Sequence, residues 1–143
     1  TLFNPYLKGL YTIMKIELAN EYPHIVLDSS SNNPFISNIG HFFDNSARIN
    51  LEGDFNSYFK VYSKAPASDT LRVLSPDMMG LMIDMGKKYD IEIVGNSLHI
   101  ISNYAFSDTA GVKYFFDLAD TLMDKLDRRV ATKHATFDTT QLK

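Results

Sequence analysis

Four histidines are the side chains of this chain whose charge can change near neutral pH, so they are the first candidates for acid–base chemistry. They are His24, His41, His99 and His134. No two of them have the spacing that would place them on one face of a helix, which argues against a zinc site on a single element. His99 stands between Leu98 and Ile100 in a β-rich run, and this favours a cross-strand contact over a catalytic base. We weigh His24, next to Pro23, in the same way.

Acidic residues in the last predicted helix form the second group that could do chemistry. Asp117, Asp120, Asp124 and Asp127 follow one another at spacings of three, four and three, and carboxylates in such a row could bind a divalent cation. The basic residues within reach of them are Lys113, Lys125, Arg128 and Arg129. Because Asp124 and Arg128 form a favourable i to i+4 pair, we interpret the row as the solvated face of a helix and expect no metal.

Sequence motifs for common enzymes are missing. The chain contains no Walker loop, no dinucleotide glycine fingerprint, no HExxH and no GxSxG. It has no cysteine, which removes thiolate nucleophiles and cysteine metal sites. A net charge of −3 makes nucleic acid an unexpected partner. We therefore predict no catalytic residue, no metal ligand and no cofactor.

Two apolar groups could form a binding surface. Phe35, Phe42, Phe43 and Phe55 lie in and just beyond a polar stretch, Ser29 to Asn45, which is longer than most structureless loops. We take these four as the candidate ligand or partner surface, and the alternative is a loop anchored by its own aromatic rings. Met78, Met79, Met82 and Met85 resemble the soft surface of promiscuous peptide binders, but their helical spacing favours packing against a sheet.

The hydrophobic pattern predicts a single antiparallel sheet of about six to seven strands. Alternation at period two predicts paired strands at Leu10–Leu18 and His24–Asp28 and further strands at Arg48–Glu52, Phe59–Ser63 and Thr70–Leu74. Phe55–Tyr58 can form one turn of helix. The last two strands, Ile91–Val94 and Leu98–Ser102, flank Gly95, Asn96 and Ser97 and predict a hairpin.

Two helices are predicted to pack on this sheet. Ser75, Pro76 and Asp77 supply a cap, a preset φ angle and an acid, so a helix begins there and ends near Gly86. The second begins near Asp108, spans about twenty residues, and carries this apolar stripe: Val112, Phe115, Phe116, Ala119, Leu122, Met123 and Leu126. The fold class is therefore α+β in the order ββ-loop-βββ-α-ββ-α. We expect one domain over residues 1–131 and a flexible tail over 132–143.

A resemblance covers about half of the chain, from Leu51 to Arg129. It rests on the residues Phe55, Phe59, Val61, Tyr62, Ser63, Leu71, Arg72, Val73, Leu74, Ser75, Pro76, Met79, Ile91, Glu92, Ile93, Val94, Leu98, His99 and Ile100. With these the chain resembles an uncharacterised family of bacterial membrane-associated proteins, whose soluble sheet-plus-helix module follows transmembrane segments. The resemblance implies an upstream anchor and a module on the cytoplasmic face of a bacterial membrane. It implies no activity and no catalytic residues.

Three functions follow from these observations, in order of preference. The first is a non-catalytic interaction or regulatory domain with a protein partner, which meets the membrane only through an upstream segment. The alternative is a small-ligand or lipid-binding domain built from the phenylalanine-rich loop and the methionine helix. The third is a hydrolase, which would require His24, His99 or His41 within roughly 3 Å of a carboxylate in a cleft.

Overall fold

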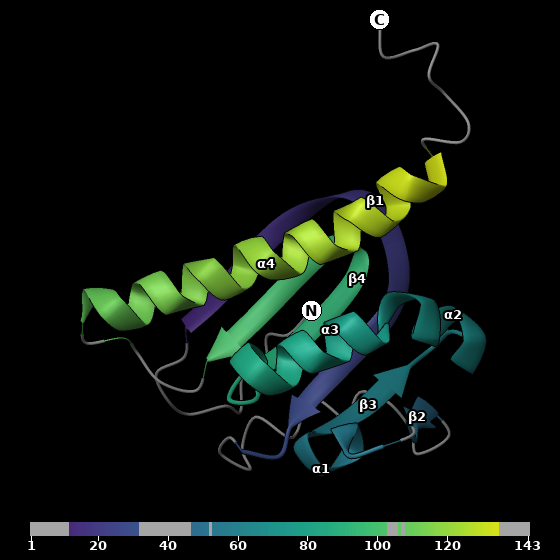
Figure 1. Cartoon of the computed structure of the whole chain (residues 1–143), viewed down its shortest axis with the longest axis horizontal. Helices are drawn as coiled ribbons and strands as arrows, with labels where there is room; N and C mark the ends of the chain where they lie inside the picture. Colours follow the sequence, from purple (N-terminus) through teal and green to yellow (C-terminus); the bar gives the residue numbers. More distant parts are fainter. Residues whose placement is uncertain (1–11, 32–46, 52, 103–105, 107, 135–143) are drawn as a thin grey trace, which may run out of the picture.

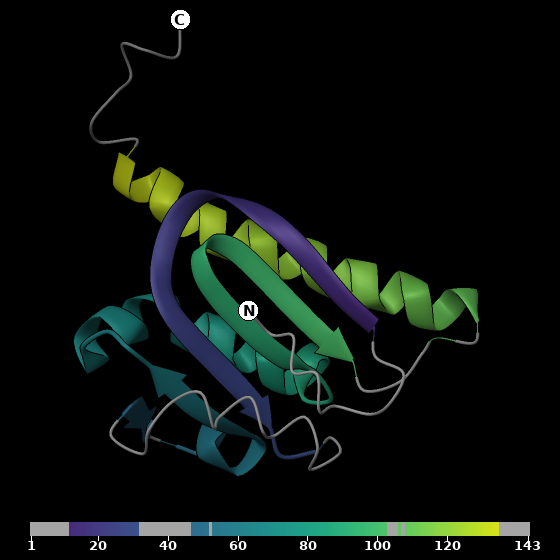
Figure 2. The same ribbon diagram turned by 180° about the vertical axis from the view of Figure 1, so that it is seen from behind.

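One antiparallel sheet with helices on one of its faces makes up the fold (Figures 1 and 2). The computed structural model describes residues 12–31, 47–51, 53–102, 106 and 108–134, the last eight by backbone alone. The strands run in the order β2-β3-β1-β4, and their bounds are β1 Thr12–Ser29, β2 Arg48–Ile49, β3 Phe59–Ser63 and β4 Asp90–Ser102. The helices are α1 Phe55–Tyr58, α2 Ala67–Val73, α3 Pro76–Leu81 with its π-helical continuation η3 Met82–Gly86, and α4 Thr109–His134.

Strands β1 and β4 are long and strongly bent, and Figures 1 and 2 show both of them turning back, with β4 inside the curve of β1. The register between them shifts twice, between Glu17 and Tyr22 and between Tyr22 and Ile25. In β4 the bend contains Gly95, whose φ of 57° lies in the left-handed region that favours glycine. Such irregularities bend a strand and increase its local twist.

The bends also keep one face of the ribbon apolar along its whole length. Before the bend in β4 the core side chains are Ile91 and Ile93, and after it they are Leu98 and Ile100. The core residues are thus at odd-numbered positions before the bend and at even-numbered positions after it. In a regular strand the even-numbered side chains would lie on the opposite face, because side chains alternate with a period of two. The bend returns these side chains to the core face, so both halves of β4 pack against the helices.

The prediction of six to seven strands is wrong, because the described chain forms one sheet of four. The predicted strands at 10–18 and 24–28 do not pair with each other where they are described. They lie in the two halves of β1, and each half pairs with β4. The predicted strands at 91–94 and 98–102 likewise belong to β4. Extended backbone continues through both bends, and a pattern of alternating residues cannot distinguish a bent strand from two short ones.

Residues 70–74 do not form the predicted strand, since most of them belong to helix α2. The structure also has four α-helices in its described part rather than two. Thr70 and Val73 are the buried residues of α2, and their spacing of three follows one helical face. The Thr70 hydroxyl donates to Ser63 Oγ at 2.7 Å and so fixes α2 to the end of β3. The short apolar run at 71–74 was compatible with either element, and this tertiary contact favours the helix.

Helix α3 begins as its cap signal predicts. Ser75 Oγ accepts a hydrogen bond from the Met78 backbone N–H at 3.2 Å, and Pro76 occupies the first turn. The helix continues as η3 and ends at Gly86. A side chain at Gly86 would come within 2.5 Å of Met82 Cε, so the glycine allows the buried methionine to lie against the backbone. The prediction that the methionines pack in the core is confirmed for Met78 and Met82.

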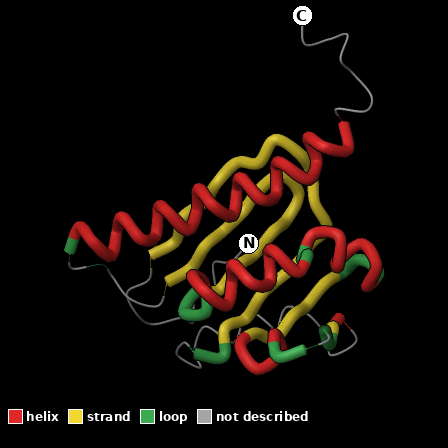
Figure 3. Tube along the Cα trace, in the orientation of Figure 1, coloured by secondary structure: helices red, strands yellow, loops and turns green. Residues whose placement is uncertain are grey.

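Helix α4 crosses the sheet diagonally, as the tube in Figure 3 shows. Its buried residues are Phe115, Leu118, Ala119, Leu122 and Leu126. They meet the sheet in one core that includes Ile25, Leu27, Ile93, Leu98 and Ile100. The apolar stripe predicted for this helix is therefore partly wrong, because Val112 and Phe116 are exposed. None of the described helices combines the length and the hydropathy that crossing a bilayer requires.

Candidate functional site

Two histidines converge on one buried glutamate on the sheet face opposite the core. His24 Nε2 lies 3.4 Å from Glu92 Oε2, and His99 Nδ1 lies 3.7 Å from Glu92 Oε1. The Glu92 side chain is 7% exposed, while those of His24 and His99 are 26% and 19% exposed. We call these three residues the His–Glu–His cluster. Each imidazole approaches a different carboxylate oxygen, so the glutamate bridges the two rings.

The cluster exists because β4 folds back on itself. Glu92 and His99 are seven residues apart, and an extended strand would separate them by about 23 Å at roughly 3.3 Å per residue. Their side chains instead come within 3.7 Å across the bend. His24 joins them from β1, where Val26, its neighbour on the same face, is paired with Glu92. The cluster therefore links both halves of β4 to β1.

The surroundings of His99 favour its neutral form. Burial lowers the pKa of His99 from its ordinary value of 6.5, and the negative charge of Glu92 offsets part of this effect. Lys15, directly opposite His99 in the β1–β4 register, lowers the pKa further. Within the described part of the chain, His99 Nδ1 is buried without a hydrogen-bond partner, because 3.7 Å from Glu92 is beyond hydrogen-bond reach.

This arrangement can take up a proton next to a buried negative charge, but it does not have the features of a metal centre. Across the described ranges, no three His, Cys, Asp or Glu side chains are arranged to hold a metal ion. The carboxylate lies on the Nδ1 side of His99, as in a hydrolytic dyad, yet the distance exceeds the roughly 3 Å that we required. None of its three residues lines the hollow described next. The hydrolase hypothesis therefore gains a histidine–carboxylate pair that lies beyond hydrogen-bond distance.

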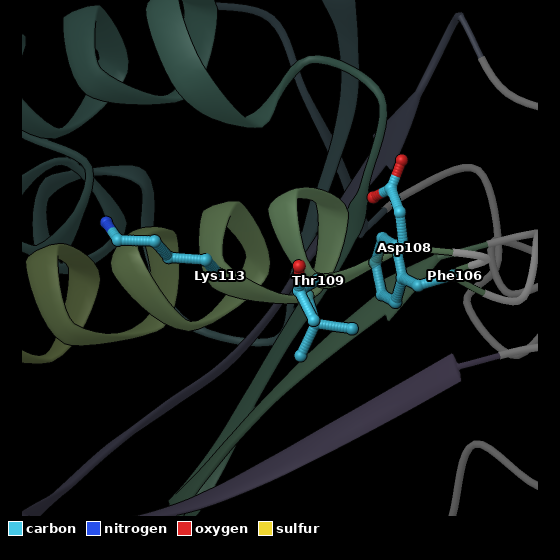
Figure 4. Close-up of a pocket in the computed structure, with 5 residues that line it drawn as sticks. Phe106, Asp108, Thr109 and Lys113 are labelled. Carbon is cyan, nitrogen blue, oxygen red and sulfur yellow. The ribbon is translucent and has the colours of Figure 1, made fainter.

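A second candidate lies at the start of α4, where a shallow hollow of about 480 Å³ is lined by Phe106, Asp108, Thr109, Val112 and Lys113. Figure 4 shows the labelled side chains of this set around the first turn of the helix. The Asp108 carboxylate accepts a hydrogen bond from the Gly111 backbone N–H at 2.7 Å and so caps α4. Phe106 packs on the core ring of Phe115 with a centroid separation of 5.1 Å.

Exposed apolar side chains continue from this hollow along α4. Phe116 is 56% exposed and Val112 is 39% exposed, and residues four apart are neighbours on a helix surface. The same spacing places Asp108 before Val112 and Asp120 after Phe116, and both acids are exposed. We call Asp108, Val112, Phe116 and Asp120 the α4 stripe. It presents two apolar side chains between two acids.

Of the predicted surface of four phenylalanines, only Phe55 is described, and it lies in the core. Its ring is 2% exposed and stacks on Phe59 with a centroid distance of 5.0 Å. Phe55 therefore anchors α1 to β3 and is not available to a partner. Phe35, Phe42 and Phe43 lie outside the described residues, so that part of the prediction stays a prediction.

Of the remaining candidates that the structure describes, Asp120 belongs to the α4 stripe and none belongs to the His–Glu–His cluster. Asp117, Asp120 and Asp124 are exposed, and the Lys113 ammonium lies 2.7 Å from the Asp117 carboxylate. This hydrogen bond and ion pair raise the pKa of Lys113. Of the other two histidines, His41 lies outside the described residues and the side chain of His134 is not described.

Sequence reasoning missed Glu92, because a single acid in a β-rich run gives no sign of what lies across a bend. It also included Phe116 in the core stripe, although that residue is one helical step past Phe115. Comparison with protein-family models, with curated proteins and with solved structures gives no match. The resemblance to a family of bacterial membrane-associated proteins therefore stays a prediction.

Proposed function

We propose that this domain is a non-catalytic interaction module that binds a partner helix along the α4 stripe. The observation that carries the proposal is the exposure of Phe116, a large apolar side chain on a helix whose other face is fully packed. Burying an aromatic side chain is among the largest single contributions to a protein interface. Val112 and the adjoining hollow extend this surface by one helical turn.

The charges around the two apolar side chains indicate what kind of partner fits. Asp108 and Asp120 stand one turn before and one turn after the apolar pair, while the Lys113 ammonium on the same helix is paired with Asp117. A complementary partner is an amphipathic helix with two apolar anchors four residues apart and a lysine or arginine one turn beyond each. Complementary charges would set the register and speed the encounter more than they raise affinity.

The size of the surface indicates a weak, reversible contact. The surface area that two exposed side chains and a shallow hollow can bury is far below that of a permanent interface. We therefore expect a dissociation constant on the order of 100 μM for an isolated peptide, since such small contacts give transient complexes. An anchor upstream of this fragment, as the resemblance implies, would raise the local concentration of a membrane-bound partner.

The test is a titration of the full 143-residue chain with a synthetic alanine-rich helix that carries two leucines four residues apart and a lysine one turn beyond each. Phe116→Ser should weaken binding at least about tenfold, because an anchor side chain contributes over 1 kcal/mol. Leu71→Ser is the matched control, since Leu71 is 45% exposed on α2, and it should leave binding unchanged.

Two further arms make the outcome decisive. A peptide with glutamates in place of its lysines should not bind measurably, because it meets two acids of like charge. Equal binding by the wild type and Phe116→Ser would refute the proposed surface. Concentration-dependent dimerisation that Phe116→Ser abolishes would instead identify a second copy of this chain as the occupant, and would refute the proposed partner.

A further inference from the structure

We propose that the His–Glu–His cluster is an acid-sensitive latch on the bend of β4, so that proton uptake by His99 favours a state in which the two halves of β4 separate. The first observation is topological. Glu92 belongs to the first half of β4, His99 to the second, and His24 to the strand that pairs with both. A change within the cluster therefore acts directly on the closure of the bend.

The second observation is that the closed bend removes His99 from water. The side chain is 19% exposed, and its Nδ1 atom is buried in the described structure without a hydrogen bond. A charged imidazolium in this position loses hydration, and only a carboxylate slightly out of hydrogen-bond range compensates. Opening the bend returns the ring to solvent, so a proton binds more tightly to the open state than to the closed one.

The charges around His99 either add to the effect of burial, which disfavours a proton on the ring in the closed state, or only partly oppose it. Within the described residues, the titratable side chains that neighbour the cluster along its strands are Lys15, Glu17 and Asp28 on β1 and Asp90 on β4. Burial disfavours a proton on His99, and the charge of Lys15 adds to this effect, so both lower the pKa of His99. Glu92 raises it, but less than burial lowers it. Helices α3 and α4 lie on the other face of the sheet (Figure 2).

The bend itself is suited to opening. It contains a left-handed glycine and the adjoining register shifts, where the ladder with β1 is interrupted. The second half of β4 pairs only with the first half of β1 within the described sheet, from Thr12 to Glu17, so opening the bend loosens a ladder that borders the register shifts. This inference does not depend on the α4 stripe, which none of the cluster residues touches.

Amide hydrogen exchange on the full chain tests the latch. After correction for the intrinsic pH dependence, exchange of residues 95–102 should rise several-fold from pH 7.5 to pH 5.5, because the proton on His99 favours the open state. Residues 115–122 of α4 should change less than about twofold over the same range. An equal rise in both segments would mean that acid unfolds the whole domain, and would overturn the proposal.

Two substitutions test whether His99 is the group responsible for the acid-induced rise in exchange. His99→Gln keeps the size and polarity of the ring region without a titratable proton, and should reduce the acid-induced rise to less than about twofold. Lys15→Gln should make the rise smaller than in the wild type, because it removes a charge that disfavours the protonated closed state. A full rise in His99→Gln would refute the role of His99.

Glu92→Gln provides an independent reading if His99→Gln does not fold. It removes the only charge in the cluster that stabilises protonated His99 in the closed state, so the acid-induced rise should exceed that of the wild type. A rise that is equal or smaller would show that Glu92 and His99 are not coupled across the bend, and the latch would be rejected.

Discussion

Replacing Gly95 with alanine should destabilise the domain, because the bend of β4 needs a left-handed backbone there. The φ angle of Gly95 is 57°, and nothing lies within 4 Å of the position where a Cβ atom would stand. The cost therefore comes from the backbone alone, at about 1–2 kcal/mol for an L-residue in this region. For a domain of this size, that loss lowers the melting temperature by roughly 3–8 °C.

Gly80 supplies the matched control for this prediction. It lies in α3, and an added Cβ would also meet nothing within 4 Å. Alanine is preferred over glycine inside a helix, so Gly80→Ala should stabilise the domain by about 0.5–1 kcal/mol. Gly95→Asn should fall between Gly95→Ala and the wild type, because asparagine tolerates the left-handed region.

Urea unfolding followed by circular dichroism gives the free energy of unfolding for each variant. The expected order of stability is Gly80→Ala, wild type, Gly95→Asn, Gly95→Ala. If Gly95→Ala were as stable as the wild type, β4 would not turn at this residue, and the contact between Glu92 and His99 would lose its structural basis.

Three further predictions concern stability. Ser75→Ala should cost about 1 kcal/mol in the same urea assay, since Ser75 Oγ caps α3, whereas Ser75→Asp should retain most of that stability. Leu118→Ala should cost about 2–5 kcal/mol because the side chain is fully buried. Phe116 is two residues away but exposed, so Phe116→Ala should change stability by less than about 1 kcal/mol. Similar losses in the two variants would contradict the orientation of α4. Finally, the pKa of His99 is lower in the folded state than its ordinary value of 6.5. The contribution of neutral His99 to the free energy of unfolding is therefore fully present above pH 6.5 and decreases as the pH falls toward the folded pKa. Between pH 7.5 and 5.5 the wild type should lose more stability than His99→Gln.

Local signals in the sequence predicted the parts of the fold that depend on neighbouring residues. The cap at Ser75 and the end of the helix at Gly86 both rest on interactions within a few positions. Near Gly95 only the positive φ angle was predicted correctly, since the two strands of the predicted hairpin are one continuous bent strand. The single antiparallel sheet and the core role of Met78 and Met82 also followed from periodicity. Residue patterns predict these features because capping and amphipathicity are properties of a single helix or strand.

Features that depend on distant contacts were not predicted. The strand count was wrong because the halves of β1 and of β4 are joined by bends, and only the pairing between these two strands shows that each is continuous. Helix α2 replaced a predicted strand because Thr70 contacts Ser63. The role of Glu92 was not predicted, since it comes from His24 on another strand and from His99 across the bend.

His99 lies beside Glu92 across the bend of β4. A proton NMR titration of the His99 imidazole in the full chain tests this contact, because the pKa of His99 depends on the neighbouring carboxylate. We predict a midpoint below 6.5 in the wild type and a lower midpoint in Glu92→Gln, because the substitution removes a charge that favours the imidazolium. A midpoint at 6.5 that does not change in Glu92→Gln would show a solvated histidine with no carboxylate beside it, and would contradict the folded-back strand.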